Sequence, residues 1–562
     1  MDILSVFCLI GSIGLFLYGM KLMSEGLQKI ASDWMRNIHA SMTQNRFYAM
    51  LTGMIITVLV LSSSTTMVMI VSFVNGGLIS LAQSLAVILG ANVGSTLFSW
   101  IISLLGFRYS LSLFVFPIIG LSLPFFQSNN STRNSVGHLL LGFSLLFLGI
   151  TVLKENITTL SQNTQLVSFF NESCAWSLGS ILLYSILGII LSILTQTNAI
   201  SFIISLLMCS NGWITFEIGC AIILGANLGT CLSPLLATRK TNTMARRAST
   251  GFSIINIIGY IWGLFLFYPF CDLISNLCVL MGLGDPDNLL YVSIGLALFH
   301  TIFNVINLCI LLPFTDKIAN LLIKSIEENK NTDESFKLQF LSKGGMMSSG
   351  EMALILARKE TSRYADETFK MYELLLKMID EPLGSEHQIQ LHHQIVEMEA
   401  ESDRAEMEIA DFLNQVSHKT LSWDGELYSR NLYKMVDELE SIADSIFHMS
   451  TTLINKQEQR VFFNKEMNID IRKMLSLIGT SLTHMCHVLS LDDIPTNALN
   501  KAYNIEDEIN NFRNQLRNAM LDRIDLQQIE YMQNSYFMML VNECEKIGDY
   551  SINVVAAACE AS

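Results

Sequence analysis

Two long stretches without charged side chains constrain the fold of this chain more than any other feature. The first runs from Phe47 to Phe107 without a single Asp, Glu, Lys or Arg, and the second runs from Ser173 to Thr238 with Glu217 as its only charge. A bilayer core about 30 Å thick needs roughly 20 apolar helical residues, so each stretch is long enough to cross it. The sequence therefore predicts an all-α, polytopic membrane protein.

The charge distribution divides the chain into two unlike parts. Residues 1–320 contain 12 Lys and Arg and 10 Asp and Glu, whereas the remaining residues contain 23 and 40. The mean hydropathy of +0.42 therefore averages an apolar part and an acidic, polar part. An acidic surface disfavours nucleic acid as a partner. The eleven cysteines are scattered without metal-ligand spacing, so we expect no cysteine chemistry.

Polar residues interrupt both charge-free stretches at corresponding places. Residues 62–66 (SSSTT) interrupt the first stretch and residues 195–198 (TQTN) interrupt the second. An offset of 135 residues aligns Ser62 with Thr197, Gly77 with Gly212, and ILGANVGST (88–96) with ILGANLGTC (223–231). Duplicated membrane halves with matching polar interruptions are typical of transporters built from inverted repeats, although parallel repeats would give the same similarity. We expect inverted repeats with re-entrant hairpins at about 47–107 and 173–238.

The hydroxyl cluster lies where lipid-facing side chains would otherwise be expected. An unpaired hydroxyl in hydrocarbon costs on the order of 2–7 kcal/mol. A single serine commonly serves helix packing, but five consecutive hydroxyl residues echoed in the second stretch favour a ligand site. Without Lys or Arg, such a site would hold an anion through helix N-termini, hydroxyl and amide donors, and co-bound sodium. The predicted substrate and sodium site comprises Ser62, Ser63, Ser64, Thr65, Asn92, Ser95, Thr96, Gln196, Thr197, Asn198, Asn227 and Thr230.

Loop charges predict the orientation in the membrane. Arg239, Lys240, Arg246 and Arg247 form the densest basic loop, which predicts a cytoplasmic position. The acidic loop around Asp285 and Asp287 then lies outside, and a last crossing at residues 289–314 leaves the C-terminal part in the cytoplasm. For the buried polar residues Asn256, His300 and Asn304 we expect satisfied hydrogen bonds between helices.

A polar linker at residues 326–350 precedes a second part, residues 351–562, whose periodicity predicts a bundle of about six helices. This part also repeats, because DELESIAD (437–444) matches NECEKIGD (542–549) at an offset of 105 residues. The pairs Glu440/Asp444 and Glu545/Asp549 each place two carboxylates on one helical face. They form either a solvated surface or a site for a divalent ion such as magnesium, manganese or iron.

Together these segments resemble the bacterial sodium/phosphate cotransporters with a PhoU-like C-terminal domain, which are related to the animal type II cotransporters. The segments that carry the resemblance are GLFLYGMKLMSEGLQ (14–28), SSSTT (62–66), NGGLISLAQSLAVILGANVGST (75–96), ILGANLGT (223–230), ARRA (245–248) and ALFHTIFN (297–304). The family has a Gln-Ser-Ser-Ser motif in each repeat, which is implicated in binding phosphate and sodium. Here Leu61 replaces the glutamine of the first copy, and Thr197, Asn198 and Ala199 replace the serines of the second.

The resemblance implies a multi-pass importer of inorganic phosphate coupled to sodium, in the cell membrane, with a transmembrane domain at residues 1–325. It also implies a cytoplasmic regulatory PhoU-like domain at residues 351–562, made of two three-helix repeats that bind metal. A homodimer is compatible with the sequence, which does not fix the oligomeric state.

Three alternatives differ from sodium-coupled import. The altered motifs leave open a phosphate sensor or a transporter of another anion with altered cation coupling. A membrane enzyme with Ser63 as nucleophile would need a general base, but the two charge-free stretches contain no His or Asp near the hydroxyl clusters, and His138 and His300 are distant in sequence. We therefore expect no enzyme activity.

Overall fold

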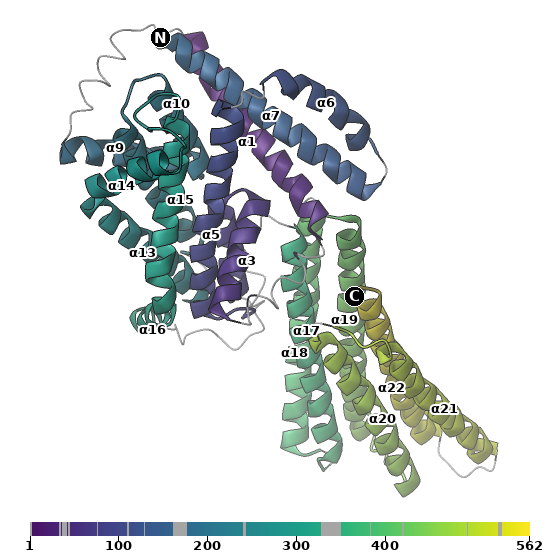
Figure 1. Cartoon of the computed structure of the whole chain (residues 1–562). Helices are drawn as coiled ribbons and strands as arrows, with labels where there is room; N and C mark the ends of the chain where they lie inside the picture. The colour runs from purple at the N-terminus through teal and green to yellow at the C-terminus, as the bar shows by residue number, and fades with distance from the viewer. Residues whose placement is uncertain are drawn as a thin grey trace. The chain divides into compact units, whose positions relative to one another are not determined.

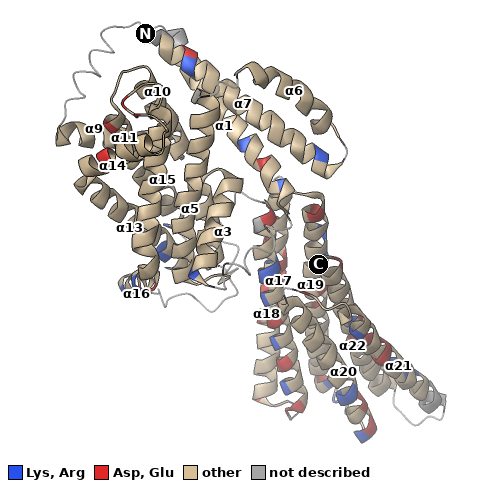
Figure 2. Cartoon of the chain, viewed as in Figure 1, with Lys and Arg blue, Asp and Glu red and all other residues tan. Residues whose placement is uncertain are grey.

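Every regular element among the described residues of the computed structural model is helical (Figure 1). The structure describes residues 3–32, 35, 42, 45–75, 77–108, 112–128, 130–160, 177–239, 243–327, 350–382, 384–418, 421–491, 493–525 and 531–561. Contacts divide the chain into two compact units, one reaching Lys330 and the other running from Ala353. Charged residues are sparse on the helices of the first unit and frequent on those of the second (Figure 2). The prediction of an all-helical chain is confirmed at this level.

Among the described residues of the first unit, seven helices are long and apolar enough to cross a membrane, which indicates a multi-pass membrane protein. They cover Val6–Ile30, Leu81–Phe107, Ser131–Thr158, Leu178–Thr195, Phe216–Ala237, Thr243–Phe265 and Val292–Ser325. The individual elements are α1 (Ile3–Ile30), α3 (Arg46–Val60), α4 (Ser63–Asn75), α5 (Leu81–Ile101), the π-helix η1 (Ile102–Arg108), α6 (Ser112–Phe126), α7 (Ser131–Leu160), α9 (Leu178–Thr195), α10 (Asn198–Ser210), α11 (Phe216–Gly229), α12 (Leu232–Ala237), α13 (Thr243–Phe265), α14 (Phe267–Leu280), α15 (Val292–Leu311), the 3-10 helix η2 (Leu312–Phe314) and α16 (Thr315–Ser325).

Two segments of this unit, α3–α4–α5 and α9–α10–α11, have the same local backbone structure. In each, the first and second helices are separated by a residue in the left-handed conformation, Leu61 or Gln196. The second helix then ends at a glycine with positive φ, Gly77 or Gly212, a residue type suited to that conformation. The third helix begins after a hydroxyl N-cap, Ser80 or Thr215. Each of these pairs is separated by the predicted offset of 135 residues.

Glycines allow the first and third helices of each segment to approach closely. A Cβ atom on Gly90 would lie 1.9 Å from the Met50 carbonyl oxygen, and one on Gly225 would lie 1.9 Å from the Ser185 carbonyl oxygen. A Cβ atom on Gly53 of α3 would likewise lie 2.0 Å from a carbonyl oxygen of α5. Small residues at such contacts let membrane helices pack backbone to backbone.

The remaining helices of the first unit surround these two segments. α1 packs along α7, and α6 packs against α7 as well. α15 packs against α5 and α11. The hydrophobic core of this unit is continuous and draws on α5, α9, α10, α11, α14 and α15. α13 contacts α4, α5 and α11, so it lies against both segments.

The second unit contains α17 (Gly350–Asp380), α18 (Glu386–Ser417), α19 (Trp423–Glu458), α20 (Lys465–Ser490), α21 (Ala498–Asp525) and α22 (Tyr531–Ala561). Its helices are amphipathic. On α19, for example, Leu432, Val436, Leu439, Ala443 and Ile446 are buried at three- and four-residue spacing. α19 and α22 pack against each other, α18 packs against α19, and α20 and α21 pack against α22.

Candidate ligand site

The first helix break places hydroxyl groups at the start of α4. Leu61 ends α3 in a left-handed conformation, with φ 57° and ψ 19°. Ser62 then caps α4, because its hydroxyl oxygen accepts a hydrogen bond from the Thr65 N–H at 3.3 Å. Ser63 and Ser64 are buried, yet their hydroxyls bond to no described residue. The break therefore leaves unpaired hydroxyls beside the first N–H groups of a helix, where an anion is favoured.

The second helix break repeats this arrangement with other residues. Gln196 has φ 56° and ψ 20°, nearly the values of Leu61. The Thr197 hydroxyl oxygen caps α10 by accepting from the Ala199 N–H at 3.2 Å. Asn198 Nδ2 donates to Asn227 Oδ1 of α11 at 3.3 Å. The second break is thereby joined to the GANLG segment of its own half.

The two equivalent asparagines have different partners. Asn92 Nδ2 donates to Asn256 Oδ1 of α13 at 3.0 Å. Asn227 Oδ1 instead accepts from Asn198 and lies 3.3 Å from His300 Nε2 of α15. Asn227 Nδ2 is buried and has no hydrogen-bond partner among the described residues. The second half therefore has an amide donor available that the first half has already used.

The hydroxyls that follow each asparagine are satisfied within their own helices. Ser95 donates to the Asn92 carbonyl oxygen and Thr230 to the Asn227 carbonyl oxygen, both at 2.8 Å. Thr96 donates in the same way to the carbonyl oxygen three residues before it, also at 2.8 Å. These three hydroxyls can therefore still accept a hydrogen bond or coordinate a cation through oxygen, but they have no free hydrogen for an anion.

His300 connects residues from both halves. Its Nδ1 lies 2.9 Å from the Ser99 hydroxyl of α5, and its Nε2 lies 3.3 Å from Asn227 Oδ1 of α11. The sequence predicts an interhelical hydrogen bond for His300, and the structure has one on each ring nitrogen. The predicted site did not include His300, although this residue contacts Asn227. Only the FHTIFN segment, in which Asn304 follows one turn later, pointed to polar contacts on this helix.

A second pair of buried hydroxyl positions also differs between the two halves. Thr57 donates to the Thr66 hydroxyl at 3.1 Å in the first half. The corresponding residues of the second half, Ser192 and Ser201, are fully buried, and their hydroxyls have no partner in the described part of the chain. This pair of positions is therefore hydrogen-bonded in the first half and not in the second.

The structure joins some of the predicted site residues but not others. Hydrogen bonds connect Asn198 to Asn227, and Asn92 to Asn256. Between described residues, no hydrogen bond links residues 62–64 with residues 196–198. Leu61 and Ala199, which flank the two breaks, belong to the same continuous hydrophobic core. A shared cavity between the breaks therefore stays a prediction.

The acidic pairs of the second unit lie on α19 and α22. Burial, and then the neighbouring Asp444 and Glu406, raise the pKa of Glu440 to about 7. Burial and Glu545 raise the pKa of Asp549 to about 6, and Glu545 itself pairs with Arg513 at 2.9 Å. The described residues contain no group of three or more metal-ligating side chains. The divalent-metal site at these acidic pairs therefore stays a prediction.

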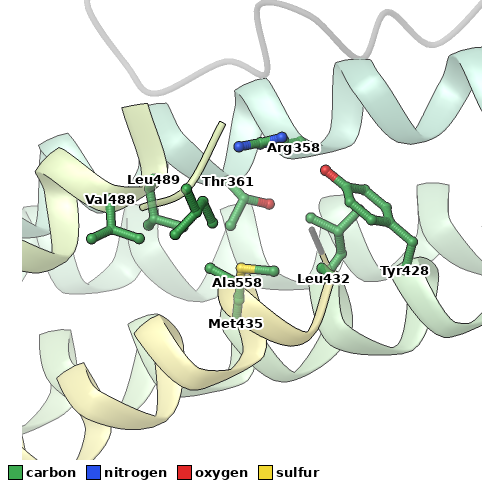
Figure 3. Close-up of a pocket in the computed structure, with 10 residues that line it drawn as sticks. Arg358, Thr361, Tyr428, Leu432, Met435, Val488, Leu489 and Ala558 are labelled. Carbon is green, nitrogen blue, oxygen red and sulfur yellow. The ribbon is translucent and has the colours of Figure 1, made fainter. Parts of the chain in front are cut away.

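The second unit also contains a small opening between its helices (Figure 3). Its wall is largely apolar, with Leu432, Met435 and Val488 among the lining residues, and Arg358 lies at its edge. Arg358 donates to the Leu491 carbonyl oxygen. We interpret this opening as a gap in helix packing rather than as a ligand site.

Comparisons with known proteins match both parts of the chain. The profile of the Na+/Pi-cotransporter family matches residues 15–155, and the profile of the PhoU domain matches residues 471–558. No solved structure matches the chain.

Three relatives illustrate the range of similarity. The putative inorganic phosphate export protein YjbB of Escherichia coli (strain K12) is 24% identical over 377 residues, which is 67% of this chain and 66% of that protein. The uncharacterized protein YqeW of Bacillus subtilis (strain 168) is 24% identical over 54% of this chain and 92% of its own length. The sodium-dependent phosphate transport protein 2A of Rattus norvegicus is 30% identical over 107 residues, 18% of this chain and 16% of that protein. The match thus spans about two thirds of the E. coli relative, 66% of its length.

Proposed function

The chain belongs to the Na+/Pi-cotransporter family and carries a C-terminal PhoU domain, and from this premise we propose that it moves inorganic phosphate across a membrane together with sodium. The family consists of transporters, which removes the alternative of a membrane enzyme with Ser63 as nucleophile. The relatives named for phosphate export and for sodium-dependent phosphate transport support phosphate as the substrate.

The observation that carries the proposal is the pair of equivalent helix breaks. We propose that the segments α3–α5 and α9–α11 are inverted repeats, and that each break forms the tip of a re-entrant hairpin. The equal conformations of Leu61 and Gln196 support the repeat. The length of α4 and α10, each 13 residues and so about 20 Å, supports re-entrance because a bilayer core is about 30 Å thick.

The chemistry of the breaks suits a phosphate anion neutralised by sodium. The unpaired hydroxyls of Ser63 and Ser64 and the free amide of Asn227 offer hydrogens to phosphate oxygens. The hydroxyl oxygens of Ser95, Thr96 and Thr230 offer lone pairs to a hard cation. Because α4, α5, α9 and α10 contain no charged residue, a phosphate dianion would need co-bound cations, which favours coupled transport over a basic channel.

We propose import driven by an inward sodium gradient, with a cytoplasmic second unit that regulates flux. The basic loop after α12 supports this orientation by the positive-inside rule. Arg247, at the start of α13, donates to the Ile326 carbonyl oxygen at 2.6 Å, so the chain leaves the first unit beside this loop. The proposed boundaries are residues 1–325 for transport, 326–350 for the linker and 351–562 for the PhoU-like domain.

Export of phosphate is a second candidate, because one set of relatives carries that name. A sensor that binds phosphate without moving it is a third, since Leu61 and Ala199 remove oxygen ligands that the family motif provides. Both candidates use the same proposed binding site as import. They differ from import in the direction of phosphate movement or in its absence, which uptake by proteoliposomes measures.

The test is uptake of labelled phosphate by proteoliposomes that contain the purified full chain, with an inward sodium gradient, an outward one or none. Sodium-driven accumulation is expected for wild type, and a loss of about tenfold or more is expected for Ser63→Ala, because a hydrogen bond to a charged ligand is worth roughly 1.5–3 kcal/mol. Ser72→Ala is the matched control, since Ser72 lies on the same helix and donates to the Val68 carbonyl oxygen. Equal uptake with and without sodium would contradict coupling, and phosphate binding without transport would favour the sensor.

A further inference from the structure

His300 ties the unpaired amide of Asn227 to the first half of the transport unit. The imidazole is 2% exposed and lies between Ser99 of α5 and Asn227 of α11, with one ring nitrogen near each. We infer that His300 is a positioning residue that holds the Asn227 side chain so that its Nδ2 donates to an oxygen of the transported oxyanion. This inference rests on the proposed function.

The hydrogen-bond pattern fixes which imidazole nitrogen carries the proton. Asn227 Oδ1 already accepts from Asn198 Nδ2, so this atom is the carbonyl oxygen of the side chain. His300 Nε2 must therefore be the N–H that donates to it, and Nδ1 carries the lone pair that accepts from the Ser99 hydroxyl. A neutral imidazole with this tautomer satisfies both neighbours without placing a charge among apolar helices.

The contact leaves one hydrogen-bond donor without an acceptor. With its oxygen shared by Asn198 and His300, Asn227 presents Nδ2 as a free N–H donor, although the residue is only 8% exposed. The equivalent donor of Asn92 is paired with Asn256 at 3.0 Å. A cation cannot accept a hydrogen bond, so the free donor favours an anionic ligand with acceptor oxygens at this position.

The ring is held from a third side by the helix that follows the second break. Phe202 of α10 stacks on His300, with ring centroids 6.2 Å apart and an interplanar angle of 29°. Asn198, at the first turn of the same helix, contacts Asn227. The position of α10 is therefore linked to the orientation of the amide through both His300 and Asn198.

Two amide substitutions of His300 separate positioning from simple packing. A glutamine amide reaches about as far as Nε2 and could still donate to Asn227 Oδ1, whereas an asparagine amide ends near the place of Nδ1 and reaches only Ser99. We expect His300→Gln to keep the KM for phosphate close to that of wild type. His300→Asn should raise the KM about tenfold, equivalent to roughly 1.4 kcal/mol, with a smaller change in the maximal rate. The measurement is initial phosphate uptake by proteoliposomes of the full chain over a range of phosphate concentrations.

Further variants decide whether His300 acts through Asn227. Asn227→Ala should raise the KM, and adding His300→Asn to it should raise the KM no further, because the partner has already been removed. His138→Gln is the control, since His138 lies on α7 and contacts the Asn134 carbonyl oxygen. If His300→Asn fails to insert, His300→Leu replaces it, because leucine fills the site without a hydrogen-bond donor and should raise the KM in the same direction.

Two different results would overturn the inference. Equal KM values for His300→Gln and for the His300→Asn or His300→Leu variant would reject the positioning role while wild-type uptake leaves the proposed function intact. Wild-type protein that neither binds nor moves phosphate under any sodium gradient would reject the proposed function, and the inference with it.

Discussion

Leu61 and Gln196 have the same left-handed backbone conformation, but their side chains have different surroundings. Leu61 is 7% exposed and belongs to the hydrophobic core, whereas the Gln196 side chain is exposed. A left-handed conformation costs an L-residue roughly 1–2 kcal/mol, and glycine avoids that cost. Removing a buried leucine side chain costs more, about 2–5 kcal/mol. The same substitution to glycine should therefore have opposite effects at the two sites.

We predict that Leu61→Gly lowers the free energy of unfolding by about 1–3 kcal/mol, whereas Gln196→Gly leaves it unchanged or raises it by up to about 1 kcal/mol. The measurement is the thermal unfolding midpoint of the purified protein in detergent. Gln196→Ala is the control, because alanine keeps the Cβ atom and therefore the backbone strain. Shifts of the same sign for Leu61→Gly and Gln196→Gly would contradict the different burial of the two side chains.

For single residues, the sequence predicted which positions of the two segments are equivalent better than it predicted which side chains are in contact. The alignment predicted that the positions of Ser62 and Thr197 are equivalent, and the structure has each of them capping a helix, because an N-cap depends on neighbouring residues. The left-handed Leu61 was not predicted, since leucine has no preference for that conformation. The contact between His300 and Asn227 joins residues 73 positions apart and depends on how α11 and α15 pack. Spacing along the chain cannot reveal such a contact.

Among the helices, close backbone contact is the feature that the segments α3–α5 and α9–α11 share. Gly90 faces Met50 and Gly225 faces Ser185, each without room for a Cβ atom. We predict that Gly90→Ala and Gly225→Ala each destabilise the first unit by about 1–3 kcal/mol or more, because the overlap is with backbone that cannot rotate away. Gly120→Ala on α6 is the control, since a Cβ atom there would meet nothing within 4 Å. The measurement is the fraction of folded protein recovered from membranes and its unfolding midpoint; unaffected Gly90 and Gly225 variants would contradict the close approach.

The raised pKa of Glu440 predicts that the stability of α18 and α19 depends on pH. The folded protein binds this proton more tightly than the unfolded chain, whose carboxyl titrates near about 4.3, so stability is highest below that value and falls as the pH rises through about 7. Glu440→Gln removes the ionisation, and we expect it to slow amide hydrogen exchange in α18 and α19 near pH 8 and to change little near pH 5.

The exchange experiment uses the full chain with a chelator present, so that no divalent ion compensates the carboxylates. Glu426→Gln is the matched control, because Glu426 is exposed on the same helix. The Glu426→Gln variant should show the same difference from wild type at both pH values. Equal effects of Glu440→Gln near pH 5 and near pH 8 would contradict the raised pKa.

Helix boundaries were predictable where a breaker residue marks them. Pro269 lies in the first turn of α14, where proline is tolerated, which accounts for the end of α13 at Phe265 within one apolar run. The break after Val60 has no Gly or Pro between residues 54 and 75, so helix propensity alone does not predict it. The hydroxyl cluster was the only local signal, and its meaning came from the second copy 135 residues later.

For the whole molecule, each compact unit has buried apolar residues of its own. The first has the continuous core of α5, α9–α11 and α15, and the second has the buried faces of α19 and α22. The sequence predicted this division, because hydropathy and charge density change together near residue 320. It did not predict how each core is assembled, since the contacts that form it join distant segments.

We predict that a chain truncated before residue 351 still inserts into the membrane, because every proposed substrate and sodium ligand and the core that supports them lie in the first unit. Its KM for phosphate should match that of the full chain, whereas its maximal flux, or the response of that flux to phosphate, should change if the second unit regulates transport. Carbonate extraction of membranes measures insertion, and proteoliposome uptake measures KM and flux. A truncated chain that fails to insert would contradict the independence of the first unit, and unchanged flux under all conditions would contradict regulation by the second.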